Sequence, residues 1–69
     1  MNRTPVESSN IADIGYEDTT MTLEIGFHNG TVYQYFDVPH SVFQEFMGAD
    51  SKGTYLNANI KNVYRYAKL

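Results

Sequence analysis

The sequence predicts an α+β domain in which helices cover one face of an antiparallel three-stranded sheet. Two observations lead to this prediction. The first half of the chain alternates apolar and polar residues with a period of two, which is typical of strands, whereas residues 42–60 repeat apolar residues at helical spacing. Strands that are followed by helices, rather than alternating with them, favour the α+β class. A chain of 69 residues has room for one such domain.

The N-terminal part of the chain divides into a lead-in and a first strand. Residues 1–9 show no apolar period, so we expect a flexible lead-in, followed by a single domain over residues 10–69. Ile11–Tyr16 predicts a short strand, in which Ala12, Ile14 and Tyr16 lie on one face. Glu17-Asp18 then mark a turn.

The clearest pattern in the chain is that of a β-hairpin. Apolar residues occupy every second position from Met21 to Phe27, and Thr31–Phe36 predicts the return strand. Asn29-Gly30 lies between them, and this dipeptide is the strongest short-range hairpin signal.

The hairpin register has two alternatives. A two-residue Asn-Gly loop would place Tyr33 and Tyr35 on the face opposite the apolar residues. A three-residue His-Asn-Gly loop with a glycine bulge pairs Ile25 with Tyr33 and Leu23 with Tyr35, so that both tyrosines lie on the core face. We favour the three-residue loop, because it keeps Gln34 out of the core.

The second half of the chain predicts two helices. Pro39 suits the first position of a helix, and the apolar residues of the 42–47 segment form one stripe of it. Ser51 can cap a second helix that extends to Ile60. The alternation in Asn62–Tyr66 allows a short closing strand.

Composition excludes several kinds of site. The chain has no cysteine, which rules out disulfides, thiolate zinc sites and cysteine nucleophiles. Its two histidines, His28 and His40, lack metal-binding spacing, so we expect neither a metal nor another cofactor. No apolar run approaches the roughly 20 residues that span a bilayer, and the first residues show no secretory signal. We therefore expect no membrane association and a cytoplasmic location.

The sequence also gives little indication of catalysis. His40 and Ser41 are adjacent, and the side chains of neighbours on a helix diverge, so they do not predict a nucleophile and its base. Lys52 precedes Gly53, the reverse of the order in a nucleotide-binding phosphate loop. We therefore expect no enzymatic activity and no small-molecule substrate.

The charges of the chain are distributed unevenly. Residues 1–50 carry eight acidic and one basic residue, a formal charge of −7, whereas residues 51–69 carry four basic residues and no acid. The net charge of −3 is unlike that of most nucleic-acid-binding domains, which are basic. Only the last third of the chain can offer a positive surface.

Two groups of residues in this chain have the types that RNA binding needs. Ser51–Thr54 opens the second predicted helix, where backbone N–H groups and the helix dipole favour an anion such as phosphate. Lys52 is misplaced there for its own helix, and a bound phosphate would reverse that penalty. The remaining candidates are cations for further phosphates and tyrosines that would stack on bases if exposed. The full set of candidate residues is Tyr33, Tyr35, Ser51, Lys52, Gly53, Thr54, Lys61, Tyr64 and Arg65.

Four stretches together resemble the KTSC domain family. They are Ser8-Ser9-Asn10-Ile11, Tyr33-Gln34-Tyr35 followed by Val38-Pro39, Ser51-Lys52-Gly53-Thr54-Tyr55-Leu56-Asn57, and the Ile60 to Tyr64 spacing. The family is named for its place at the C-terminus of some lysyl-tRNA synthetases and also occurs as free-standing bacterial and phage proteins. The resemblance implies a suggested role in RNA binding. It does not carry over aminoacylation, because the chain has no synthetase portion.

These observations lead to two functional hypotheses. The first is a non-enzymatic module that binds RNA through the basic last third and exposed tyrosines. The alternative is a protein-interaction module that uses an exposed sheet edge or a tyrosine-rich patch and has no nucleic-acid role.

Overall fold

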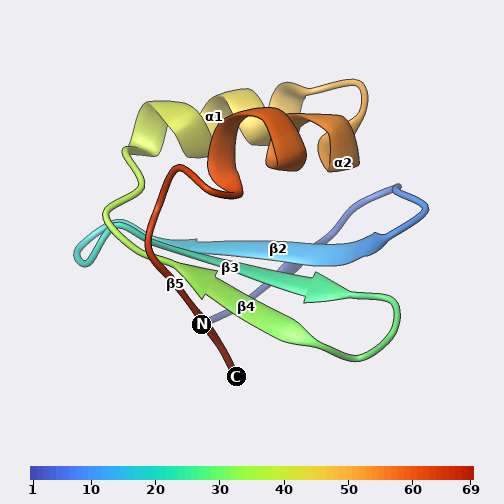
Figure 1. The fold of residues 1–69 in the computed structure, drawn as a ribbon, viewed down its shortest axis with the longest axis horizontal. Coiled ribbons are helices and arrows are strands. Elements are labelled where there is room, and N and C mark those ends of the chain that lie inside the picture. Colours follow the sequence, from blue (N-terminus) through green and yellow to red (C-terminus); the bar gives the residue numbers. More distant parts are fainter.

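The computed structural model describes residues 1–69 and has two layers, a sheet and a helical layer that covers one of its faces (Figure 1). The sheet has five antiparallel strands in the order β1-β2-β3-β4-β5. The strands are β1 (Thr4–Pro5), β2 (Ile11–Glu17), β3 (Thr22–Phe27), β4 (Val32–Tyr35) and β5 (Tyr66–Lys68). The helical layer contains α1 (His40–Gly48), α2 (Lys52–Tyr55) and the π-helical η1 (Leu56–Ile60). Because η1 continues α2 directly, we refer to the two together as the C-terminal helix.

The α+β class is confirmed, but the predicted three-stranded sheet is wrong in strand number. The two additional strands lie at opposite edges of the sheet. β1 lies inside the expected lead-in of residues 1–9, and its Thr4 pairs with Ile14 of β2. Part of that segment therefore has regular structure. The closing strand begins at Tyr66 rather than Asn62, because residues 61–65 carry the chain from the helical layer back to the sheet. Strands of two or three residues are too short to show a period.

The three-residue hairpin loop is confirmed. Leu23 pairs with Tyr35 and Ile25 pairs with Tyr33. Gly30 adopts a φ of 90°, a conformation that glycine reaches without steric cost, and its N–H donates to the carbonyl of Phe27 at 2.9 Å. The hairpin therefore places both tyrosines on the face that the helices cover.

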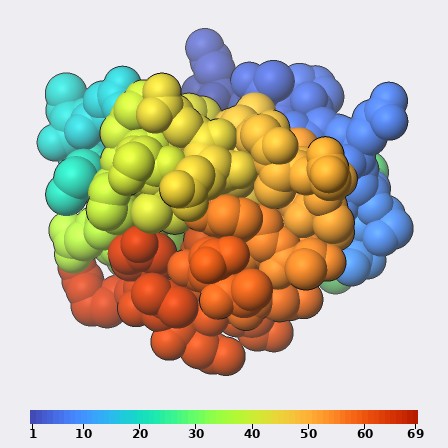
Figure 2. Space-filling model, turned by 90° about the horizontal axis from the view of Figure 1, so that it is seen from above, coloured from blue at the N-terminus to red at the C-terminus, as the bar shows by residue number.

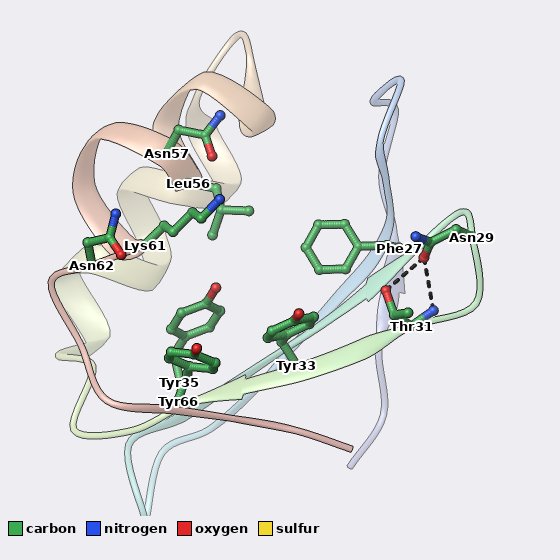
Figure 3. A pocket seen from close by; sticks show the side chains of 10 residues that line it. All are labelled: Phe27, Asn29, Thr31, Tyr33, Tyr35, Leu56, Asn57, Lys61, Asn62 and Tyr66. Atoms are coloured by element: carbon green, nitrogen blue, oxygen red, sulfur yellow. Dashed lines mark hydrogen bonds between the residues drawn. The ribbon is translucent and has the colours of Figure 1, made fainter.

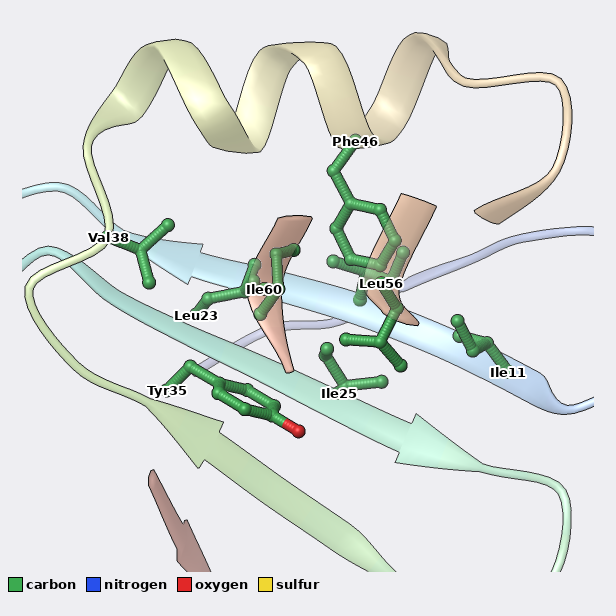
Figure 4. Packing of buried hydrophobic residues seen from close by; sticks show 9 residues of the cluster. Ile11, Leu23, Ile25, Tyr35, Val38, Phe46, Leu56 and Ile60 are labelled. Atoms are coloured by element: carbon green, nitrogen blue, oxygen red, sulfur yellow. The ribbon is translucent and has the colours of Figure 1, made fainter. Parts of the chain in front are cut away.

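The core lies between the helices and this face of the sheet (Figure 4). Phe46 of α1 and Ile60 of the C-terminal helix are fully buried against Leu23 and Ile25 of β3. The π-helical geometry is defined by the bond from the Lys61 N–H to the carbonyl of Leu56 at 2.8 Å. Figure 2 shows the helical face, where α1 and the C-terminal helix lie side by side between the N-terminal and C-terminal edges of the molecule.

The opposite face of the sheet carries a charged cluster instead of apolar residues. Glu24 is only 7 % exposed and accepts hydrogen bonds from Arg3 at 2.6 Å and from Gln34 at 2.8 Å. Burial alone would raise the pKa of Glu24, but these hydrogen bonds and the Arg3 charge outweigh it and lower the pKa. A Cβ at Gly15 would lie 2.6 Å from the carbonyl oxygen of Asn2, so the glycine lets the N-terminal segment lie directly on the sheet.

No helix of the structure combines the length and the apolar character that crossing a membrane requires.

Candidate functional site

An open cavity of about 330 Å³ lies between the C-terminal helix and the β3–β4 hairpin (Figure 3). This volume is within the range of pockets that hold small ligands. Four aromatic rings, three asparagines and one lysine are among its ten lining residues. They are Phe27, Asn29, Thr31, Tyr33, Tyr35, Leu56, Asn57, Lys61, Asn62 and Tyr66. We call it the tyrosine cavity.

The floor of the tyrosine cavity is a continuous aromatic surface. Phe27 meets Tyr33 edge to face with 5.8 Å between ring centroids, and Tyr33 lies 5.8 Å from Tyr66. Tyr66 is also 6.0 Å from Tyr35, its direct cross-strand partner. Cross-strand partners share one face of a sheet, so the pairing of β4 with β5 is what assembles this surface.

The three tyrosines of the floor differ in exposure. Tyr66 is 61 % exposed and Tyr33 is half-buried, whereas Tyr35 is only 4 % exposed. Burial, followed by the neighbouring phenols, raises the pKa of Tyr35. Of the two tyrosines here that were predicted to stack on bases if exposed, Tyr33 is accessible and Tyr35 is not. Tyr66 was not among the predicted site residues, although Tyr64-Arg65-Tyr66 repeats the Tyr-x-Tyr pattern of β4.

The rim of the cavity carries polar side chains with free ends. Asn57, Lys61 and Asn62 are exposed and come from the last turns of the C-terminal helix and the residues after it. The side-chain hydrogen bonds of the surrounding segments involve none of these three residues. Lys61 extends along the helical wall of the cavity (Figure 3), so its ammonium group is available to a ligand there.

A second cation lies beside the aromatic floor. Lys68 is the direct cross-strand partner of Tyr33 and therefore lies on the same face of the sheet. Lys68 and Lys61 are both exposed, and neither takes part in a salt bridge of the molecule. Lys68 was not among the predicted site residues.

A second cavity, of about 320 Å³, contains the predicted phosphate-binding segment. Its ten lining residues are all polar, charged or glycine: Glu7, Ser8, Ser9, Asn10, Asp50, Ser51, Lys52, Gly53, Thr54 and Asn57. We call it the polar cleft. It shares Asn57 with the tyrosine cavity, and residues 7–10 meet residues 50–57 in it.

Within the polar cleft, the side chains of the predicted phosphate-binding segment, Ser51, Lys52 and Thr54, are hydrogen-bonded within the protein. The Ser51 hydroxyl caps α2 by accepting from the Thr54 N–H at 3.3 Å, as the sequence predicts. Lys52, however, donates from Nζ to the carbonyl of Ala49 at 3.0 Å, at the C-terminal end of α1. A cation stabilises that end of a helix. Glu7 and Asp50 add two negative charges, so the cleft is a poor place for a phosphate.

The other two predicted site residues lie apart from both cavities. Arg65 forms a salt bridge with Asp37 at 2.7 Å and lies over the Phe36 ring at 5.5 Å. Tyr64 is half-buried against the core. The structure therefore brings Tyr33, Tyr35 and Lys61 together in one cavity and Ser51–Thr54 in another.

The remaining titratable side chains do not form a metal centre. His40 lies 2.8 Å from Asp18, and both side chains are exposed. No group of three or more histidine, cysteine, aspartate or glutamate side chains is placed to hold a metal ion.

The amino-acid sequence of this chain matches a known protein family. The sequence pattern of the KTSC domain family matches residues 7–64. These residues include every strand except β1 and β5 at the edges of the sheet. This chain belongs to the KTSC domain family. A crystal structure of a KTSC domain protein from Yersinia pestis superimposes with a TM-score of 0.93 and 42 % sequence identity, covering 99 % of this chain and 96 % of that one.

Other proteins with segments similar to this chain differ greatly in length. A protein of Tsukamurella paurometabola is 37 % identical over 65 residues, which are 94 % of this chain and 97 % of that protein. The lysine–tRNA ligase of Trichormus variabilis is 44 % identical over 63 residues, which are 91 % of this chain. The matched part is only 11 % of the length of that ligase.

Proposed function

We propose that this KTSC domain is a non-enzymatic module that binds RNA through the tyrosine cavity. The observation that carries the proposal is the meeting of accessible aromatic rings, free amide groups and an unpaired lysine at one open cavity. Proteins bind RNA bases by stacking them on aromatic rings and by hydrogen bonds to the base edges, and they bind the backbone through cations.

Each of these roles has a candidate residue. Tyr66 and Tyr33 offer ring surface for stacking. The carboxamides of Asn57 and Asn62 combine a donor and an acceptor, the groups that a base edge requires. Lys61 supplies a positive charge at the rim.

The relatives add support of a different kind. Curated relatives that contain a similar segment are named lysine–tRNA ligases, and a tRNA is an RNA ligand. The segment is a small part of those ligases, so the ligase reaction is not part of the proposal.

An NMR titration of the domain with an unstructured oligoribonucleotide at low and at high salt tests the proposal. We expect shifts at Tyr66, Lys61 and Asn57 that weaken at high salt, because part of the binding is electrostatic. The variant Tyr66→Leu removes the aromatic ring and should weaken the binding. Val63→Ala is a matched control, because Val63 is 60 % exposed and lies outside the cavity.

Two results would contradict the proposal. The absence of binding at low salt would exclude RNA as the ligand and favour a protein partner. Equal losses in Tyr66→Leu and Val63→Ala would show that the aromatic floor is not the binding surface.

A further inference from the structure

We infer that the cavity takes single-stranded RNA, with one unpaired base on the aromatic floor and the adjacent backbone crossing the β5 edge between Lys61 and Lys68. This inference rests on the proposed function and names the form of the RNA, its path and a second phosphate contact.

The shape of the site favours an unpaired base. The aromatic floor is carried by the β3–β4 hairpin and β5, and the C-terminal helix forms the opposite wall of the cavity (Figure 3). A base in a duplex has both faces covered by its neighbours, so it cannot lie on a tyrosine ring unless it leaves the stack. A base in a single strand has no such cost to meet.

The two free lysines mark the ends of the backbone path. Lys61 lines the helical side of the cavity, and Lys68 is the cross-strand partner of Tyr33 on the sheet side. The other basic residues near the site are engaged, because Lys52 binds the Ala49 carbonyl and Arg65 pairs with Asp37.

The acidic residues determine the direction in which the RNA leaves the cavity. Beyond Asn57 the polar cleft presents Glu7 and Asp50, which repel phosphates. On the other side β5 is the edge strand of the sheet and carries Tyr66 and Lys68. The bound RNA therefore runs outward over β5 and not along the beginning of the C-terminal helix.

Fluorescence anisotropy with a labelled oligouridylate of about eight nucleotides, a usual site size for such modules, tests the inference at several salt concentrations. We expect Lys61→Ala and Lys68→Ala each to reduce the salt slope of log K by about 0.7, the value for one phosphate contact of a single strand. Lys52→Ala is the matched control and should keep the slope of the parent. Tyr66→Leu should weaken binding about tenfold.

A duplex RNA of matched length provides the second comparison. Weaker binding of the duplex than of the oligouridylate supports the inference. Equal affinity for both overturns it and leaves RNA binding by the domain intact. A parental slope in Lys68→Ala, with a reduced slope in Lys61→Ala, overturns the path across β5. Binding of neither RNA overturns the proposed function itself.

Discussion

The tyrosine cavity and the polar cleft are close in volume, adjoin each other and share Asn57, yet their chemistry is opposite. Half of the residues that line the tyrosine cavity are hydrophobic, and none of those that line the cleft are. The side chains of Asn57, Lys61 and Asn62 at the rim of the cavity make no hydrogen bond within the protein, whereas those of Ser51, Lys52 and Thr54 in the cleft do. A site that holds a ligand needs groups with unused bonding capacity, so residue type alone does not identify it.

Two lysines at opposite ends of the C-terminal helix differ in the same way. Lys52 lies in its first turn, where a positive charge opposes the dipole of that helix. The bond to the Ala49 carbonyl shows that Lys52 instead stabilises the end of α1. Lys61 follows the last turn, is exposed and is free to bind a ligand.

The largest effect that we predict removes both cavities at once. The C-terminal helix forms a wall of each, and Phe46 packs beneath it with its ring 5.5 Å from that of Tyr55. Phe46→Ala should lower the free energy of unfolding by about 3–5 kcal/mol, a large part of the stability of a small domain. Chemical denaturation measures this loss. A midpoint close to that of the parent would show that the helical layer does not depend on Phe46.

The next effect separates the cavities by ligand binding. Tyr66→Ala should weaken RNA binding by about 1–3 kcal/mol, the usual contribution of one stacked base. Because Tyr66 is 61 % exposed, the stability should change by less than about 0.5 kcal/mol. Anisotropy and thermal melting of the same samples measure the two quantities. Loss of affinity together with a large loss of stability would mean that Tyr66 has a structural role.

A crossed pair of lysine variants sharpens the comparison further. Lys52→Ala should cost about 1 kcal/mol of stability, because the Ala49 carbonyl loses its hydrogen bond, and it should leave RNA affinity unchanged. Lys61→Ala should lower RNA affinity and leave the stability unchanged. Chemical denaturation and anisotropy on both variants check this pattern. If Lys52→Ala lost affinity while keeping its stability, the phosphate site would belong in the polar cleft.

The smallest effect that we predict is a loss of stability at alkaline pH, and it concerns Tyr55. This residue joins the C-terminal helix to α1 through a 2.8 Å hydrogen bond that its hydroxyl donates to Glu45. Burial, the hydrogen bond to Glu45 and the charge of Glu45 raise the pKa of Tyr55 from about 10 to about 12. A raised pKa means that the fold favours the neutral phenol, so its contribution to stability is full below pH 10 and is lost as the pH rises through 12.

Measuring the free energy of unfolding as a function of pH for the parent and Tyr55→Phe checks this expectation. The parent should lose stability above about pH 10, and the variant should lose less. Identical alkaline profiles would show that Tyr55 titrates with its ordinary pKa.

The sequence by itself determined the parts of the protein that depend on neighbouring residues. The period of two in the hairpin, the Asn29-Gly30 turn and the exclusion of Gln34 from the core led to the correct register. The Ser51 cap followed from the same local reasoning, because a cap bonds to a residue only three positions away.

Only the tertiary structure decided the edge strands, the charged cluster around Glu24 and the arrangement of the candidate site. β1 and β5 are too short to have a period, and the pairing of β5 with β4 joins segments far apart in the chain. That pairing brings Tyr66 and Lys68 beside Tyr33. Whether a side chain such as Lys52 is free depends on what packs against it across space, because burial and hydrogen bonding are properties of the whole fold and not of a local pattern.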